Sequence, residues 1–345
     1  MYTLREIFAS HNYTYESART YLSKIPPSEL EGDPLPDILD AGYFHLVRDL
    51  LPPPTDATEV LLSLFLFGIS LPAPTISAAL PQLSVFLLTS STLLLNPPHS
   101  PTHVLSPYQI YPLSTALFNA LNKPSTILLA TDWSLESLIP PKFAIMPIGQ
   151  DTLELIAVHT SDPSPANPPR VLDMCSGSGA QGITYKLTTC PSCELTMVDV
   201  NPRAVKMCEL NKLLNNVEGR VVQGACWEPL DEDEKFGRIL CNPPFVAVPD
   251  PEPQTNIYDQ PSLYATGGPK GDEVLRSILR PLQTRLTETG RFYCVTEVQN
   301  VKSSPEMITD MVEKDSGDMR VNVAYCVEDV ETVAEYSKVR SEERG

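Results

Sequence analysis

Residues 171–185 read Val-Leu-Asp-Met-Cys-Ser-Gly-Ser-Gly-Ala-Gln-Gly-Ile-Thr-Tyr, and this stretch decides the fold. It predicts a short buried strand, a glycine-rich turn and the start of a helix. Glycines at 177 and 179 let the backbone approach a ligand closely, and the amides at a helix start favour electronegative ligand groups. We therefore expect Gly177 and Gly179 to hold part of a cofactor.

A second apolar strand ends in a carboxylate twenty residues after Gly179. Asp199 closes the run 195–199, at the position where a doubly wound fold places an acid on ribose hydroxyls. A helix cap is the alternative, because Asn201-Pro202-Arg203 begins the next helix with proline at a suitable place. The two roles are compatible if Asn201 caps the helix and Asp199 binds the ribose.

After residue 170 the pattern alternates between strands and helices. This spacing predicts an α/β fold, an open, doubly wound parallel sheet with helices on both faces. The expected strands are 170–175, 195–199, 219–223, 237–242, 290–296 and 319–327, and the expected helices are 180–189, 202–215, 271–287 and 305–314.

The tetrad Asn242-Pro243-Pro244-Phe245 follows an apolar pair and ends a strand abruptly, because neither proline can donate to a sheet ladder. The Pro243 carbonyl and the Asn242 amide oxygen are then left as acceptors, with the flat face of Phe245 beside them. Such a site fits a planar NH2 group, whose two hydrogens it can accept. A proline-rich loop is the alternative reading, since the chain holds 35 prolines.

Residues 177–182 also satisfy the dinucleotide fingerprint G-x-G-x-x-G, so a nicotinamide enzyme has to be considered. Asp173 argues against it, because a carboxylate near this turn favours a ligand with an amine and a sulfonium over a pyrophosphate. The Asn-Pro-Pro-Phe tetrad also has no evident role in hydride transfer.

Together, Asp173-x-x-x-Gly177-x-Gly179, the acid at Asp199 and the tetrad resemble class I S-adenosylmethionine-dependent methyltransferases of the small-domain group. This group includes release-factor glutamine methyltransferases and ribosomal RNA guanine methyltransferases. The resemblance covers roughly residues 145–330. It implies a Rossmann-like methyltransferase sheet, the cofactor S-adenosyl-L-methionine, and methyl transfer to a planar amide or amine nitrogen.

The resemblance also implies particular site residues. Residues 223–227 stand where the family has Gly-Asp and an aromatic around the adenine; Ala225 replaces the acid here, and Trp227 either stacks on adenine or belongs to the core. The segment 264–272 is similar to a glycine-rich, substrate-facing loop, and 147–152 loosely resembles a segment that closes over the cofactor. The implied cofactor-binding residues are Asp173, Cys175, Ser176, Gly177, Gly179, Asp199, Val200, Gly224, Ala225, Cys226 and Asn242, the implied catalytic residues are Asn242, Pro243, Pro244 and Phe245, and no metal is implied.

The length of 345 residues predicts two domains. Helical patterns and proline-rich connectors over 1–105 predict a helical, winged-helix-like accessory domain. Residues 106–166 hold two expected bridging strands, 125–130 and 142–146, followed by a proline-rich linker. Residues 167–345 form the expected methyltransferase domain, in which the family's seventh strand is not evident. A truncated sequence and a domain that has lost this strand both fit the pattern.

Five cysteines fall in or beside apolar runs, where we expect small reduced side chains. They are Cys175, Cys226, Cys241, Cys294 and Cys326. Cys190 and Cys193 form the one C-x-x-C pair of the sequence, and without a second pair it is a weak indication of zinc or redox chemistry.

Charge constrains the partner. The formal net charge is −8 over 1–170 and −10 over 171–345, so neither half suits phosphate-driven binding to free nucleic acid. We expect a protein glutamine or a small molecule as methyl acceptor, with an RNA base amine as the alternative. A non-catalytic cofactor-binding adaptor is the alternative of another class, and the intact tetrad disfavours it.

Two further features bear on location. The apolar run 60–69 is too short to span a membrane, and the first twenty residues lack an apolar signal segment. We expect a cytoplasmic protein with no membrane partner, and no oligomeric state follows from the sequence.

Overall fold

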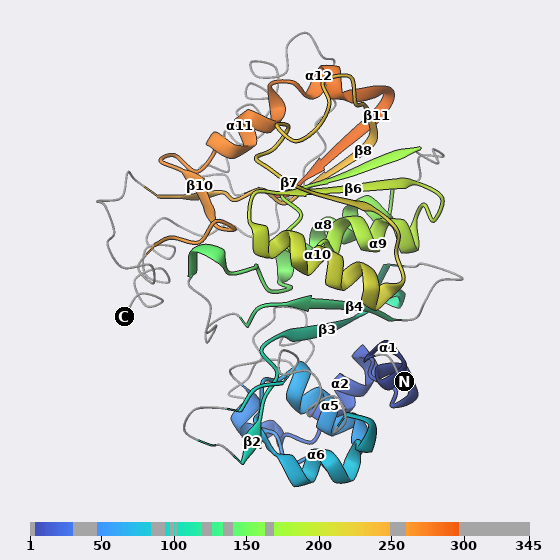
Figure 1. Cartoon of the computed structure of the whole chain (residues 1–345), viewed down its shortest axis with the longest axis vertical. Coiled ribbons are helices and arrows are strands. Elements are labelled where there is room, and N and C mark those ends of the chain that lie inside the picture. The colour runs from blue at the N-terminus through green and yellow to red at the C-terminus, as the bar shows by residue number, and fades with distance from the viewer. Residues whose placement is uncertain are drawn as a thin grey trace.

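The computed structural model describes residues 4–29, 47–83, 94–96, 100, 102–118, 126–133, 141–162, 169–248 and 260–296. Figure 1 shows a group of helices at one end, a two-stranded sheet in the middle, and a larger sheet with its helices at the other end. The predicted strand 319–327 and helix 305–314 lie outside the described residues.

The larger sheet has five parallel strands in the order β11-β8-β5-β6-β7. From β5 the chain moves outward through β6 and β7, and it then returns to β8 and β11 on the other side. The switch point therefore lies between β5 and β8, and the predicted α/β fold is confirmed. The strands are β5 (Arg170–Met174), β6 (Glu194–Asp199), β7 (Arg220–Gln223), β8 (Phe236–Cys241) and β11 (Leu286–Cys294).

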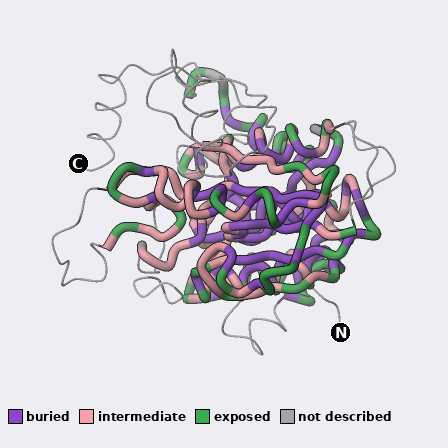
Figure 2. Tube along the Cα trace, turned by 90° about the horizontal axis from the view of Figure 1, so that it is seen from above, coloured by how far each residue is buried: buried purple, intermediate pink, exposed green. Residues whose placement is uncertain are grey.

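Helices cover both faces of this sheet. Val171 of β5 belongs to one hydrophobic cluster with Ile183, whereas its neighbour Leu172 belongs to a second cluster with Leu279. Alternate residues of a strand face opposite sides, so each cluster fills one side. Figure 2 shows the buried strands in the centre of the molecule. The helices are α8 (Gln150–Thr160), α9 (Ala180–Thr188), α10 (Pro202–Asn215), α11 (Glu273–Leu279) and α12 (Leu282–Arg285).

Gly182 allows α9 to pack closely on the sheet. A Cβ at this position would lie 2.8 Å from Leu195 Cδ1 and 3.0 Å from Asp173 Cβ. Distances this short leave no room for a larger residue. The third glycine of the sequence fingerprint therefore serves helix–strand packing.

The described N-terminal part is largely helical. Thr14 and Asp56 cap two of its helices, because their side chains accept hydrogen bonds from Ser17 N and Glu59 N. No helix in the described ranges combines the length and apolar character needed to cross a bilayer. The elements are α1 (Leu4–Ser10), α2 (Tyr15–Leu22), η1 (Pro27–Glu29), η2 (Arg48–Leu50), α5 (Ala57–Phe65), β1 (Leu71–Pro72), α6 (Ala73–Ala79) and β2 (His103–Val104).

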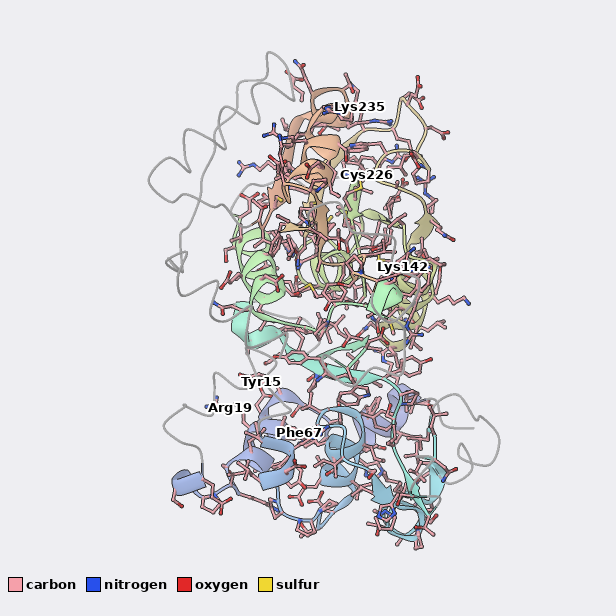
Figure 3. The ribbon with its side chains drawn as sticks, turned by 90° about the vertical axis from the view of Figure 1, so that its left-hand side faces the viewer. Tyr15, Arg19, Phe67, Lys142, Cys226 and Lys235 are labelled. Carbon is pink, nitrogen blue, oxygen red and sulfur yellow. The ribbon has the colours of Figure 1, made fainter. Side chains whose placement is uncertain are left out.

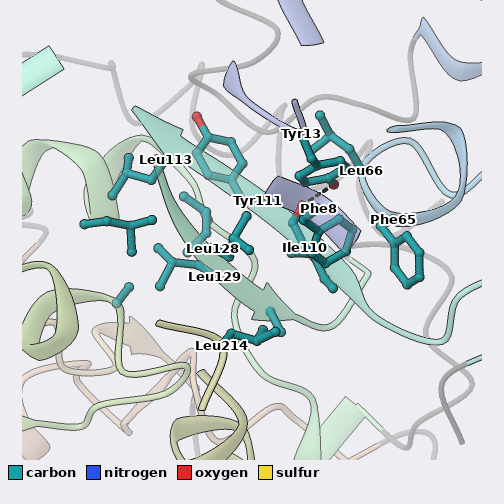
Figure 4. Packing of buried hydrophobic residues seen from close by; sticks show 14 of the residues in the cluster. Phe8, Tyr13, Phe65, Leu66, Ile110, Tyr111, Leu113, Leu128, Leu129 and Leu214 are labelled. Carbon is teal, nitrogen blue, oxygen red and sulfur yellow. Dashed lines mark hydrogen bonds between the residues drawn. The ribbon is translucent and has the colours of Figure 1, made fainter. Parts of the chain in front are cut away.

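An antiparallel pair of strands, β3 (Gln109–Ser114) and β4 (Thr126–Thr131), lies between the N-terminal helices and the larger sheet. Tyr13 Oη donates a hydrogen bond of 2.6 Å to the Ile110 carbonyl. Figure 4 shows Phe8 and Tyr13 against this pair of strands and Leu214 of α10 on the side of the larger sheet. The two strands are therefore part of one continuous hydrophobic core.

Two buried asparagines join β4 to α10. Asn215 accepts from Leu128 N at 2.9 Å and donates to Leu128 O at 2.7 Å. Asn211 makes the same pair of bonds with Ala130, at 2.7 and 2.9 Å. These side chains replace a neighbouring strand along this edge of β4, so the backbone groups there are paired.

The prediction of a strand at 142–146 is wrong. The chain forms a short 3₁₀ helix, η4 (Pro141–Phe143), and then an irregular segment. Its backbone bonds to side chains, since Ile145 N donates to Asp132 Oδ2 and Asn201 Nδ2 donates to the Phe143 carbonyl. The segment consequently has no strand partner. The sequence also gave no indication of β3 or α8, whereas the strand at 125–130 is confirmed as β4.

Candidate functional site

A cavity of about 210 Å³ opens at the carboxyl ends of the parallel strands, next to the switch point. Its walls come from the segments that follow β5, β6, β7 and β8. The irregular segment 144–148 and the stretch 263–266 also line it. The lining residues from the strand ends are Cys175, Ser176, Gly177, Ser178, Val198, Asp199, Val200, Asn201, Gly224, Ala225, Cys226, Asn242 and Pro244.

The glycine-rich turn forms the floor of the cavity. Gly177 and Gly179 have φ of 53° and 78°, in the left-handed region that favours glycine. Gly179 N donates to Ser176 O at 2.6 Å, and Gly179 is the N-cap of α9. The tight turn brings the backbone of 175–178 against the cavity and leaves it free of bulky side chains.

Asp199 lies directly beside this turn. Its Oδ2 accepts from Gly177 N at 2.7 Å, and its Oδ1 accepts from Asn201 N at 2.8 Å. Each carboxylate oxygen retains a lone pair for a ligand hydroxyl. Burial raises the pKa of Asp199 to about 6. Asn201 caps α10 by accepting from Arg203 N, so the cap and the cavity wall are provided by different residues.

Asp173 is buried under the turn and does not line the cavity. Its Oδ2 accepts a hydrogen bond of 2.9 Å from Gly182 N, at the start of α9. Burial raises the pKa of this carboxyl well above its usual range. Its contacts join β5 to the first turn of the helix, so a direct contact with a ligand amine is not part of this geometry.

Asn242 is held by a carboxylate from a distant part of the chain. Its Nδ2 donates to Asp151 Oδ2 at 3.1 Å, and Asp151 Oδ1 accepts from Thr152 N at 2.7 Å. Burial raises the pKa of Asp151. Because the NH2 end of Asn242 is occupied by Asp151, the amide oxygen remains as its acceptor toward the cavity.

Gln181 is fixed in a similar way. Its Oε1 lies 2.9 Å from His159 Nε2, and its Nε2 donates to the Thr152 carbonyl at 3.0 Å. Burial lowers the pKa of His159 to about 4, so the imidazole is neutral at physiological pH. The helix α8 therefore positions two residues of the cavity wall, Asn242 and Gln181.

The chain was compared with known protein families and proteins. Residues 155–257 match the family model of the methyltransferase small domain. That segment contains the glycine-rich turn, Asp199 and the tetrad, and the resemblance predicted from these motifs is confirmed.

Two curated proteins are similar to part of this chain. The chain is 33% identical over 95 residues to the release factor glutamine methyltransferase of Fusobacterium nucleatum, over 26% of this chain and 27% of that protein. It is 32% identical over 132 residues to the ribosomal protein uL3 glutamine methyltransferase of Bradyrhizobium diazoefficiens, over 36% of this chain and 40% of that protein. The matches therefore span less than half the length of either relative.

Among solved structures, the 16S rRNA N2 G1207 methyltransferase of T. thermophilus, in complex with AdoMet and guanosine, superposes with a TM-score of 0.37 and 14% identity. The superposition covers 75% of this chain and 63% of that one.

Trp227 belongs to the hydrophobic core of the larger sheet. It is buried in the cluster that contains Met174 and Ile239, and its Nε1 donates to the Ile278 carbonyl at 3.0 Å. Trp227 is therefore a core residue and does not line the cavity. The part of the cavity wall where adenine was expected is formed by Gly224, Ala225 and Cys226.

The glycine-rich stretch after Tyr264 packs directly on the tetrad. The strand β10 (Thr266–Gly268) pairs in parallel with β9 (Val246–Ala247), which begins immediately after Phe245. Val246 N donates to the Ala265 carbonyl at 2.8 Å. Tyr264 is partly exposed and lines the cavity. The stretch thus braces the tetrad and provides part of the cavity wall.

Replacing Gly267 with alanine is expected to lower the free energy of unfolding by about 2 kcal/mol or more. The new Cβ would lie 2.2 Å from the Gly271 carbonyl oxygen and 2.7 Å from the Pro244 carbonyl oxygen, both of them backbone atoms. Thermal denaturation measures the change. Gly149→Ala is the matched control, since a Cβ there meets nothing closer than 3.4 Å. Equal melting temperatures for the two variants would contradict the expected clash.

Most of the predicted site residues border the cavity, and four do not. Asp173 lies beneath the turn, Gly179 closes the turn without lining the cavity, and Pro243 and Phe245 are not part of the cavity lining. Sequence reasoning did not name several lining residues. For Ile148 and Thr152, the loose resemblance of 147–152 to a cofactor-covering segment was the one indication. The lining residues outside the predicted set are Ala144, Ile145, Met146, Ile148, Thr152, Ser178, Ala180, Gln181, Val198, Asn201, Ala204, Leu263, Tyr264, Thr266 and Val274. Of these, Tyr264 and Thr266 belong to the loop 264–272 that the sequence had indicated.

Proposed function

We propose that this chain is an S-adenosyl-L-methionine-dependent N-methyltransferase that acts on a planar amide NH2 group, with a protein glutamine as the favoured acceptor. The observation that carries the proposal is Asn242, which lines the cavity at the end of β8 with its NH2 end held by Asp151. An oriented amide oxygen at this point is suited to accept a hydrogen bond from a substrate NH2.

The cavity walls fit the proposed cofactor. Asp199 offers carboxylate lone pairs for ribose hydroxyls, while Gly177 allows close approach of the backbone. Val200 is 48% exposed and offers an apolar surface beside them. Cys175, Ser176, Gly224, Ala225 and Cys226 supply further wall backbone. When bound, the cofactor supplies an electrophilic methyl group on a sulfonium.

The chain's own residues would act chiefly by positioning. Asn242 Oδ1 and the Pro243 carbonyl would accept the two hydrogens of the substrate NH2, which directs the nitrogen lone pair away from them. Asp151 would keep the Asn242 amide from rotating. Phe245 would stack on the planar group if the substrate enters from its side. Alignment and polarisation would then provide most of the rate, and the nitrogen can lose its proton after transfer.

Glutamine in a protein is favoured as the acceptor for two reasons. The two curated relatives are named as glutamine methyltransferases acting on a release factor and on a ribosomal protein. The net charge of −18 also disfavours tight binding of free RNA through phosphates. We propose a cytoplasmic location, because the proteins named as acceptors of those relatives work in translation.

The direct test is to incubate the purified chain with labelled S-adenosyl-L-methionine and separate protein, RNA and small-molecule fractions. Purified release factors and ribosomal proteins serve as candidate acceptors. We expect label in protein as methylglutamine, with less than about a tenfold change between 50 and 200 mM salt. Label in RNA together with a steep loss of activity over that salt range would reject the glutamine assignment in favour of an RNA base.

Cofactor affinity is expected to depend on the protonation of Asp199. Its pKa of about 6 means that the carboxylate, which accepts from hydroxyls, predominates above that pH and is lost below it. Calorimetry should therefore show S-adenosylhomocysteine binding roughly tenfold weaker at pH 5 than at pH 7.5, since about a tenth of the group is then ionised. Asp199→Asn cannot ionise and should flatten this dependence. Equal affinity of the native chain at both pH values would exclude the proposed ribose contact.

A further inference from the structure

Four cysteines gather around the inner end of the cavity. Cys241 of β8 pairs in register with Met174 on one side and with Cys294 of β11 on the other. Cys175 directly follows Met174. Cys226 comes from the segment after β7, and Figure 3 labels it above Lys142. Segments distant in sequence thus bring thiols together at one point of the fold.

Two of these cysteines share the cavity. Cys175 and Cys226 both line it and are both partly exposed, whereas Cys241 is fully buried. Cys226 Sγ also lies 3.4 Å from Ser277 Oγ on α11. A solute that enters the cavity can therefore reach Cys175 and Cys226, while Cys241 stays behind them.

Both cavity cysteines have an unusual backbone conformation. Their φ values are 58° for Cys175 and 49° for Cys226, in the left-handed region that disfavours residues with a Cβ. Such positions concentrate at functional sites, where the surrounding structure maintains them. Glycine would fit either position with less backbone strain, and both side chains pack against the cluster that contains Met174 and Trp227.

The two thiols also differ in character. Hydrogen bonds from the thiols of Cys226 and Cys241 lower the pKa of the Cys175 thiol. The contact with Cys175, together with burial, raises the pKa of Cys226. A thiolate is the reactive form toward oxidants, and a neighbouring protonated thiol can then complete a disulfide.

We propose that Cys175 is an oxidation site for peroxides, with Cys226 as its resolving thiol, and that the resulting disulfide prevents ligand binding in the cavity. In the first step the Cys175 thiolate attacks hydrogen peroxide, the O–O bond breaks, and a sulfenic acid and hydroxide form. In the second step Cys226 sulfur attacks that sulfenic sulfur and water leaves. Overall, two thiols and one peroxide give one disulfide and two waters.

The disulfide would join two segments of the cavity wall whose thiols are already in contact. Cys175 belongs to the turn after β5, and Cys226 follows Gly224 and Ala225 after β7. A covalent link between these two segments would occupy space between the 175–178 turn and residues 224–226, where the adenine of the cofactor is expected. This consequence rests on the proposed function, whereas formation of the disulfide does not.

The Cys190–Cys193 pair is an internal control. Both side chains are buried in the larger hydrophobic cluster, and neither lines the cavity. Burial raises the pKa of Cys193 to about 12, so its thiol stays protonated and unreactive. We expect peroxide to leave this pair unchanged.

The test uses the full chain, treated with hydrogen peroxide near pH 7.5 and then with an alkylating reagent. Non-reducing digestion and mass spectrometry should give a cross-linked peptide pair that contains Cys175 and Cys226. Cys226→Ser should instead accumulate a sulfenic acid at Cys175, which dimedone traps. Cys193→Ser should form the same cross-link as the native chain.

Calorimetry with S-adenosylhomocysteine provides the second measurement. Oxidation should weaken binding at least tenfold, and dithiothreitol should restore it. Two free cavity thiols after treatment, or a cross-link from Cys175 to Cys241, would overturn the proposal, as would unchanged binding by the cross-linked chain. A cross-link in a chain that fails to bind S-adenosylhomocysteine even when reduced would refute the proposed function and leave the oxidation site supported.

Discussion

Replacing Asn242 with alanine is expected to lower turnover about 100-fold or more while cofactor affinity stays within a few-fold. The amide oxygen of Asn242 is one of the two acceptors proposed for the substrate NH2, and alanine removes it. The ribose side of the cavity is formed by Asp199 and the 175–178 turn, which the substitution does not touch. Single-turnover rates and calorimetry with S-adenosylhomocysteine separate the two effects.

Asn242→Asp is a useful companion, because aspartate keeps an acceptor of the same shape but would face the Asp151 carboxylate at hydrogen-bond distance. That repulsion should make the variant almost as inactive as Asn242→Ala. An equal loss of turnover and cofactor affinity in the alanine variant would mean that the tetrad is a structural element of the cavity wall.

Replacing Asp151 with alanine is expected to lower turnover about 30-fold, again with little change in cofactor affinity. Asp151 does not line the cavity; it accepts from Asn242 Nδ2 at 3.1 Å and so fixes which end of the amide faces the substrate. Without Asp151 the Asn242 amide can rotate and turn its NH2 group toward the substrate NH2, which is itself a donor. Steady-state kinetics should show the loss in kcat, because the orientation matters when the nitrogen is aligned for transfer.

The matched variants test whether Asp151 acts through Asn242. Asp151→Asn retains an acceptor oxygen and should recover most of the activity, whereas Gln150→Ala, at the exposed neighbouring position of α8, should behave like the native chain. A double variant of Asp151 and Asn242 should lose no more than Asn242→Ala alone. Additive losses would show that the two residues act independently.

The sequence predicted the parts of the site that depend on local chemistry. Glycines that permit positive φ at 177 and 179 mark the turn, and the prolines after Asn242 mark the end of β8. Asp199 closes β6 as its position in the run 195–199 indicated. In each case the residues that define the feature are neighbours in the chain.

Features that depend on contacts between distant segments were missed. Asp151 lies 91 positions before Asn242, and nothing at either position indicates the other. Asn211 and Asn215 are buried because their partners are backbone groups of β4, and their neighbours in the chain do not indicate those partners. The failed strand at 142–146 has the same origin, since its backbone bonds to side chains from elsewhere in the chain.

The paired bonds between α10 and β4 restrict how this chain could have been assembled from parts. Recombination that joined another N-terminal unit to residues 167–345 would leave Asn211 and Asn215 facing it with two donors and two acceptors. Only a unit presenting an extended edge in the same register as Leu128 and Ala130 would satisfy them. Any other unit would bury unpaired amides, at a cost of about 1–3 kcal/mol for each lost partner. The N-terminal part with its β3–β4 pair and the parallel sheet that carries the cavity would therefore be inherited together.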